Sequence, residues 1–217
     1  MEAVVVDAGS KLLKAGIAAP DQSPPLVMPS KMKLEVEDQE LADGAVVEEV
    51  VQPVVRGFVK DWDAMEDLLN YVLYRNVGWE IGDEGQILFT EPLFTPKTLR
   101  EQLVQLMFEK FNVSGFYASE QAVLSLYAVG RISGCTVDIG HGKIGFEDRF
   151  QREANLSASA ICPSLVKPPE YMPENLARYS AWMGGAILAK VVFPQNQHVT
   201  KGEYDETGPS IVHKKCF

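Results

Sequence analysis

Cysteine and histidine are both scarce in this chain of 217 residues, which contains three of each. The cysteines, Cys135, Cys162 and Cys216, are too few and too far apart for a disulfide framework or a zinc knuckle. The histidines are equally scattered, so structural roles outweigh a metal-ligand cluster. We therefore expect that the protein works in a reducing compartment and has no zinc site.

Long apolar runs are also missing. The best membrane candidate, residues 181–193, is too short and contains Lys190. Asp7 interrupts the apolar run that ends at Val6, which argues against a secretory signal. With 46% hydrophobic and 23% charged residues, the composition predicts a soluble intracellular protein of one substantial domain or two small ones.

Basic residues are scarce. The chain has 20 basic and 30 acidic residues, which gives a net charge of −10. This balance disfavours a broad phosphate-binding face, so we expect no direct contact with nucleic acid. If the protein works near DNA or RNA, another chain makes the contact. Part of the acidity is concentrated at 35–40 and 48–49, which is either a solvated loop or an acidic docking segment.

The pattern along the chain alternates apolar strands with amphipathic helices. An apolar strand at 3–6 is followed by a candidate hairpin partner at 14–18, and residues 31–57 form an excursion that could be a short sheet. Asp61 is a suitable N-cap for one helix, and Thr95 for another that has Pro96 at its first position. The remaining expected elements are strands at 87–90, 116–118, 135–139 and 161–166, and helices at 120–127, 146–154 and 175–192. The alternation predicts an α/β fold.

Two glycine turns carry the strongest chemical signal. Each follows an apolar strand that ends in aspartate, at residues 4–10 and 135–143. Glycine lets backbone N–H groups approach a phosphate closely, and aspartate can organise a divalent cation through water. Either turn alone is more simply read as a tight hairpin, whereas the pair favours a nucleotide clamp. A Walker loop is excluded because the second turn lacks the four-residue spacer.

A run of small residues, Gly184-Gly185-Ala186, lies within the expected helix at 175–192. Glycine removes the side chain that would hold two backbones apart. We expect the helix to approach a neighbouring element or a cofactor closely at this point.

Three segments resemble the actin family in detail: 121–131, 180–189 and the tail 203–217. The resemblance implies an actin-like, ribonuclease H-like ATPase fold of the α/β class. It covers two blocks, an N-terminal lobe at 1–144 that includes a small acidic subdomain at 31–57, and a C-terminal segment at 145–217 that completes this first lobe. Most of the second large lobe of an actin has no counterpart, so the chain looks like an internally shortened form.

The resemblance also implies how a nucleotide would be held. Gly9 and Ser10 would meet the terminal phosphates of ATP or ADP, and Lys14 would contact them. Gly140 and Gly142 would close the second turn. The pocket for the adenosine moiety comes from the missing lobe, so we expect nucleotide binding to be weak or absent.

The resemblance also implies which residues would position a metal ion and the attacking water. Asp7 and Asp138 would organise Mg²⁺ through water, and Gln121 would orient the attacking water molecule. His141 replaces the second aspartate of its turn, and Gly145 stands where actins have a histidine. These departures weaken hydrolysis, since water, base and metal must be held together.

The expected function is that of a nuclear protein, with the cytoplasm as a further candidate location, that acts as a non-polymerising structural subunit of a chromatin-remodelling complex. Its expected partners are other remodeller subunits, contacted through a helical segment of the remodeller, and it would bind no membrane. Two alternatives stay open: an ATP-binding protein with slow hydrolysis, and a shortened product without independent function.

Overall fold

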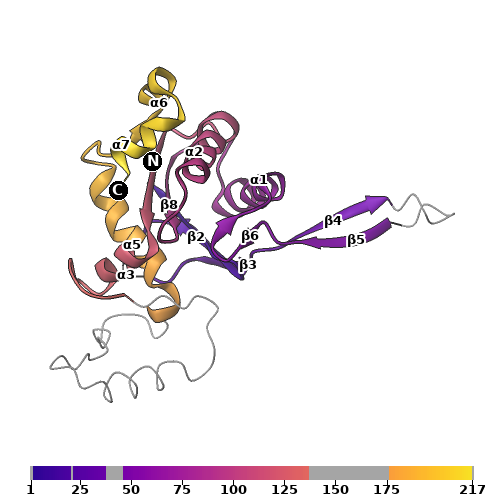
Figure 1. Cartoon of the computed structure of the whole chain (residues 1–217), viewed down its shortest axis with the longest axis horizontal. Coiled ribbons are helices and arrows are strands. Elements are labelled where there is room, and N and C mark those ends of the chain that lie inside the picture. The colour runs from indigo at the N-terminus through magenta and orange to yellow at the C-terminus, as the bar shows by residue number, and fades with distance from the viewer. Residues whose placement is uncertain (1, 21, 38–45, 137–175, 217) are drawn as a thin grey trace, which may run out of the picture.

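A central sheet of six strands organises the computed structural model, which describes residues 2–20, 22–37, 46–136 and 176–216. The strand order is β10-β9-β8-β1-β2-β3, and Figure 1 shows the sheet between two groups of helices. The strands are β1 (Val4–Ala8), β2 (Leu12–Ile17), β3 (Leu26–Pro29), β8 (Gln86–Glu91), β9 (Gly115–Glu120) and β10 (Val199–Thr200).

The centre of the sheet combines antiparallel and parallel pairing. Strand β1 pairs with β2 in the antiparallel hairpin that the sequence predicted, with Asp7 opposite Lys14. On its other side β1 runs parallel to β8, and β8 runs parallel to β9. Every residue of β1 is buried, as its apolar composition requires of a central strand.

The helices cover both faces of the sheet. Figure 1 shows α1 and α2 on one side and α3 and α5 on the other. Their bounds are α1 (Trp62–Asn70) with the π-helical segment η1 (Tyr71–Val77), α2 (Lys97–Gln105) with the π-helical segment η2 (Leu106–Lys110), α3 (Gln121–Ala128), α5 (Leu176–Val192), α6 (Lys201–Thr207), the 3₁₀ turn η3 (Pro209–Ile211) and α7 (Val212–Lys215). The mixed α/β architecture confirms the predicted fold class.

One predicted helix cap is confirmed and the other is wrong. The Asp61 carboxylate accepts a hydrogen bond from the Ala64 backbone N–H at 2.9 Å and caps α1. By contrast, α2 begins at Lys97 with Pro96 at the N-cap, and no side chain caps it. The Thr95 hydroxyl instead donates to the Pro92 carbonyl oxygen at 2.7 Å, which closes the loop before the helix.

The excursion at 31–57 does contain the short sheet that the sequence suggested. Strands β4 (Met32–Glu37) and β5 (Val46–Val51) pair with each other and project from the body of the molecule in Figure 1. A second small hairpin, β6 (Val54–Val55) with β7 (Phe58–Val59), lies nearer the main sheet.

Several expected elements cannot be compared with the structure. The helix at 146–154 and the strand at 161–166 lie outside the described residues, as do residues 137–139 of the strand that was expected at 135–139. The first two residues of that strand, Cys135 and Thr136, are described and belong to no strand.

Helix α5 crosses α3 at very short range because of its small residues. A Cβ built on Gly184 would lie 1.8 Å from the Leu124 carbonyl oxygen, and one on Gly185 would lie 2.9 Å from a methyl group of Val5. The expected close approach is thus to a neighbouring helix and to the sheet. Just before the crossing, the fully buried Trp182 donates its indole N–H to the Val5 carbonyl oxygen at 3.2 Å.

The expected core positions are largely confirmed. Met65, Met107 and Met183 are fully buried, and Trp79 is 8% exposed. Trp62 is only partly buried. None of the helices in the described ranges is long and apolar enough to cross a membrane.

The C-terminal segment packs on the β9 edge of the sheet around His198. This side chain is 3% exposed, and its imidazole lies so close to Gly115 that an added Cβ would be 2.5 Å from the ring. Further along the tail, the Cys216 thiol accepts a hydrogen bond from the Ala118 N–H, and burial raises its pKa to about 12. The tail is therefore part of the core and its thiol is protonated at neutral pH.

Burial of His198 should make the stability of the protein depend on pH. Burial lowers the pKa of the imidazole, an effect that the nearby Lys215 reinforces and a hydrogen bond to the Val192 backbone and Glu203 oppose. The folded state then favours the neutral ring, so this contribution to stability is complete above the unfolded pKa of about 6.5 and is lost as the pH falls below it. Thermal melts between pH 5 and pH 8 should show a decline of at most ~1.4 kcal/mol per pH unit from this residue.

The variant His198→Gln provides the comparison, because its side chain does not titrate. The difference in unfolding free energy between wild type and variant should shrink on acidification. A difference that stays constant from pH 8 to pH 5 would contradict the assignment.

Candidate functional site

The candidate site lies where two neighbouring parallel strands end. Strand β1 places Asp7 at its carboxyl end, and β8 places Thr90 at the same edge, because Val6 is in register with Phe89. Both side chains are buried, with Asp7 3% and Thr90 1% exposed. In open α/β sheets this edge is the usual position of ligand sites.

Four side chains meet there and are called the Asp7 cluster: Asp7, Lys14, Thr90 and Gln121. The Lys14 ammonium lies 2.7 Å from Asp7 Oδ2. The Thr90 hydroxyl donates to Asp7 Oδ1 at 2.8 Å, and the Gln121 amide donates to the same oxygen at 3.1 Å. Both oxygens of this buried carboxylate therefore have hydrogen-bond partners inside the protein.

The strand topology explains why Gln121 lies beside Asp7. Strand β9 runs parallel to β8 and ends at Glu120, and Gln121 is the first residue of α3. Its amide also lies 3.2 Å from the Thr90 hydroxyl oxygen, to which it donates. The carboxyl ends of β1 and β8, the middle of β2 and the start of α3 thus fix the four side chains of the cluster.

The first glycine turn lies next to the cluster and is tied to a distant segment. The Gly9 N–H donates to the Leu12 carbonyl oxygen at 3.1 Å, and a Cβ on Gly9 would lie 2.9 Å from that oxygen. The Ser10 hydroxyl oxygen accepts a hydrogen bond from the Gly57 N–H at 2.7 Å. Since the oxygen acts as acceptor, the hydroxyl hydrogen remains able to donate to a ligand.

The predicted site residues are therefore only partly brought together. Asp7, Lys14 and Gln121 are in contact, and the turn of Gly9 and Ser10 follows directly. The predicted second half of the clamp, Asp138, Gly140 and Gly142, lies outside the described residues. Thr90 was not predicted, although it ends the apolar run 87–89 in the same way that Asp7 ends the run 4–6.

The donors of the cluster suit the phosphate end of a nucleotide. Lys14 supplies a positive charge, Gln121 an amide, and the turn at Gly9 backbone N–H groups, which are the groups that bind phosphate oxygens. Among the residues that the structure describes, no three His, Cys, Asp or Glu side chains gather as a metal-ligand set. Asp7 is the carboxylate that would face a hydrated Mg²⁺.

A second buried carboxylate follows directly on β8. Glu91 is 4% exposed and forms a two-pronged ion pair with Arg100 of α2, whose Nε lies 3.0 Å from Glu91 Oε2. Burial raises the pKa of Glu91, and the guanidinium opposes that shift. This pair joins α2 to the sheet edge beside the Asp7 cluster.

Comparison with known proteins identifies the family. The model of the actin family, described as Actin, matches residues 1–145 and 143–217, two pieces that meet at 143–145. Actin-related protein 7 from Oryza sativa subsp. japonica is 57% identical, and that from Arabidopsis thaliana is 46% identical, each aligned over 100% of both chains. Centractin from Saccharomyces cerevisiae is 47% identical over 42% of this chain and 23% of its own length.

These alignments also show that the chain is shortened internally. The alignment with the rice protein runs over 360 residues, more than the 217 that this chain contains, so it includes positions that have no counterpart here. This agrees with the mixed sheet of a truncated actin-like fold. The chain therefore belongs to the actin family and, within it, to the group of actin-related protein 7.

Proposed function

We propose that this protein is a nuclear, non-polymerising structural subunit of a chromatin-remodelling complex, with an ATP site that is vestigial. The observation that carries the proposal is the closed Asp7 cluster, in which Lys14, Thr90 and Gln121 all bond to the same carboxylate. Because these side chains meet one another's hydrogen-bonding and charge requirements, they stabilise the fold without a ligand.

Nucleotide binding would have to compete with this arrangement. The Lys14 ammonium is 2.7 Å from Asp7 and only 14% exposed, so a phosphate must offset the loss of a buried ion pair. In addition, the shortened chain lacks positions that its relatives have, and by resemblance these include the walls of the adenosine pocket. Weak or absent affinity for ATP and ADP follows from both points.

The charge of the chain supports an indirect relation to chromatin. At −10, the protein is repelled by the phosphate backbone of DNA, so contact with nucleic acid would be made by other subunits. The expected partner surface is a helical segment of the remodeller.

The experiment is purification of the tagged full chain from nuclei, with identification of co-purifying proteins by mass spectrometry. Recovery of remodeller subunits in fixed proportion supports the proposal. A chain that is found only outside the nucleus, or that purifies alone from nuclear extract, contradicts it.

A second candidate is an ATP-binding protein with slow hydrolysis. The favouring observation is that Lys14 and Gln121 already lie at the Asp7 edge beside an intact glycine turn. Calorimetry with Mg-ATP should then show binding that weakens in Asp7→Ala and is unchanged in Lys190→Ala, a change at an exposed ion pair with Glu2. Titration of high protein concentrations without heat beyond dilution rules this candidate out.

A further inference from the structure

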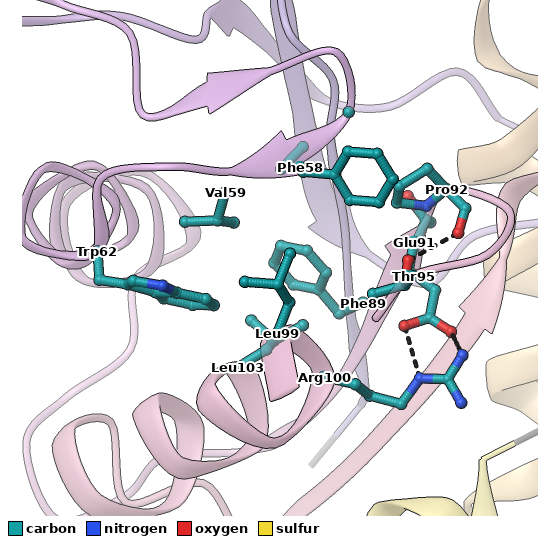
Figure 2. Close-up of a pocket in the computed structure, with 13 residues that line it drawn as sticks. Phe58, Val59, Trp62, Phe89, Glu91, Pro92, Thr95, Leu99, Arg100 and Leu103 are labelled. Atoms are coloured by element: carbon teal, nitrogen blue, oxygen red, sulfur yellow. Dashed lines mark hydrogen bonds and ion pairs between the residues drawn. The ribbon is translucent and has the colours of Figure 1, made fainter. Parts of the chain in front are cut away.

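An apolar pocket lies between the small β6–β7 hairpin and helix α2, as Figure 2 shows. Its walls come from five different elements, β1, β7, α1, β8 and α2, so the pocket is built by the tertiary fold. The apolar side chains around it are Phe58, Val59, Trp62, Phe89, Leu99 and Leu103. Of these, Phe58, Val59, Trp62 and Leu99 are only partly buried, which leaves apolar surface open to a partner.

The loop at the edge of the pocket adds further apolar surface. Pro92 and Thr95 line the pocket, and between them Leu93 is 48% and Phe94 is 84% exposed. Phe94 has a φ of 60°, an unfavourable backbone angle for an aromatic residue. The hydrogen bond from Thr95 to the Pro92 carbonyl oxygen holds this loop in place.

The charges that flank the pocket are mainly basic, in contrast to the acidic chain as a whole. Arg56 and Lys60 flank the lining segment 57–59, and Lys97 lies between Thr95 and Leu99 in sequence. All three are exposed, and none belongs to an ion pair with another described residue.

The nearby carboxylates offset these charges only in part. Glu91, which lines the pocket, is paired with Arg100. Asp61 accepts the capping hydrogen bond of α1, and Asp63 lies exposed in the first turn of that helix. The basic residues therefore leave an excess of positive charge beside the apolar surface.

We propose that this pocket binds an acidic peptide segment of a partner protein, anchored by one aromatic or large aliphatic side chain. The anchor would lie against Phe58, Trp62 and Leu99, and the flanking acidic residues of the peptide would face Arg56, Lys60 and Lys97. An apolar anchor in a pocket supplies affinity, while charges at the rim select the partner and speed its association.

This site is separate in its chemistry from the Asp7 cluster. The two adjoin at Ala8 and Thr90, which line the pocket, but the Thr90 hydroxyl is directed to Asp7. Peptide binding therefore requires neither a nucleotide nor membership of a remodelling complex. Its failure would leave the proposed function intact, and the reverse also holds.

The test is fluorescence anisotropy with the full chain and three labelled peptides. The first carries one phenylalanine between runs of glutamate, the second has serine in place of phenylalanine, and the third has lysine in place of glutamate. The first should bind, the second about tenfold more weakly, and the third not measurably. Because these changes are made in the peptide, they cannot disturb the fold of the protein.

Two matched charge reversals locate the site on the protein. Lys97→Glu should weaken binding of the first peptide several-fold, and added salt should weaken wild-type binding more than that of the variant. Lys190→Glu makes the same charge change on α5, on the other side of the sheet, and should leave binding unchanged. Equal effects of the two variants, or equal binding of the phenylalanine and serine peptides, overturn the proposal.

A second copy of this chain is the other occupant of the pocket that must be tested. Sedimentation of the protein alone over a range of concentrations should show a monomer. Concentration-dependent association that is lost in Phe94→Ser would mean that the patch pairs with itself, and this too would overturn the proposal.

Discussion

Replacing Gly184 with alanine should cost about 3 kcal/mol of stability, at the upper end of what overpacking a core usually does. The added Cβ would lie 1.8 Å from the Leu124 carbonyl oxygen and 2.4 Å from its carbonyl carbon, and contacts below 3.0 Å are essentially never seen for real Cβ atoms. Those atoms belong to backbone, which cannot move aside alone, so α3 and α5 must separate. Thermal unfolding should shift down by about 2–4 °C for each kcal/mol.

The matched control is Gly202→Ala in α6. No heavy atom lies within 4 Å of a Cβ placed there, so alanine should raise stability by about 0.5–1 kcal/mol through its better helix propensity. Both variants make the same chemical change within a helix. Equal melting temperatures for the two would show that α3 and α5 do not cross as closely as described.

Displacement of α3 should also disturb the hydrogen bonds of the Asp7 cluster. Gln121 is the first residue of that helix, and its amide holds Asp7 and Thr90 at 3.1 and 3.2 Å. A helix pushed outward at Leu124 carries Gln121 with it. The close packing of α5 on α3, which Gly184 permits, therefore helps to position Gln121 in the site.

The parts of the fold that follow from neighbouring residues were predictable from the sequence. The hairpin of β1 and β2, the capping of α1 by Asp61 and the helix α5 all follow from patterns within one segment of the chain. The cap of α2 was predicted wrongly for a local reason as well. Pro96 has a ψ of 140°, outside the helical range, so the helix begins one residue after it.

What the sequence could not provide is the contact between distant strands. Thr90 reaches Asp7 because β8 pairs in parallel with β1 in one particular register, across 83 positions of chain. The bond from Gly57 to Ser10 likewise spans 47 positions. Such contacts depend on tertiary packing, and a single sequence carries no periodic signal for them.

Substituting Asp7 with alanine should lower the free energy of unfolding by about 3–5 kcal/mol, the range found when one partner of a buried ion pair is removed. The change leaves the Lys14 ammonium, 14% exposed, without its carboxylate, and removes the acceptor to which Thr90 and Gln121 donate. Denaturant titration of wild type and variant measures the difference. The loss should occur without nucleotide, because the contacts are internal to the protein.

A double-mutant cycle separates the ion pair from the rest of the cluster. Lys14→Met in the Asp7→Ala background removes the uncompensated charge, so the double variant should be more stable than Asp7→Ala alone. Lys190→Ala breaks the exposed pair with Glu2 and should change stability far less than Asp7→Ala does. If Asp7→Ala were as mild as Lys190→Ala, the cluster would not hold the strand ends together. Its residues would then be arranged for a ligand, which favours the ATP-binding candidate over the structural one.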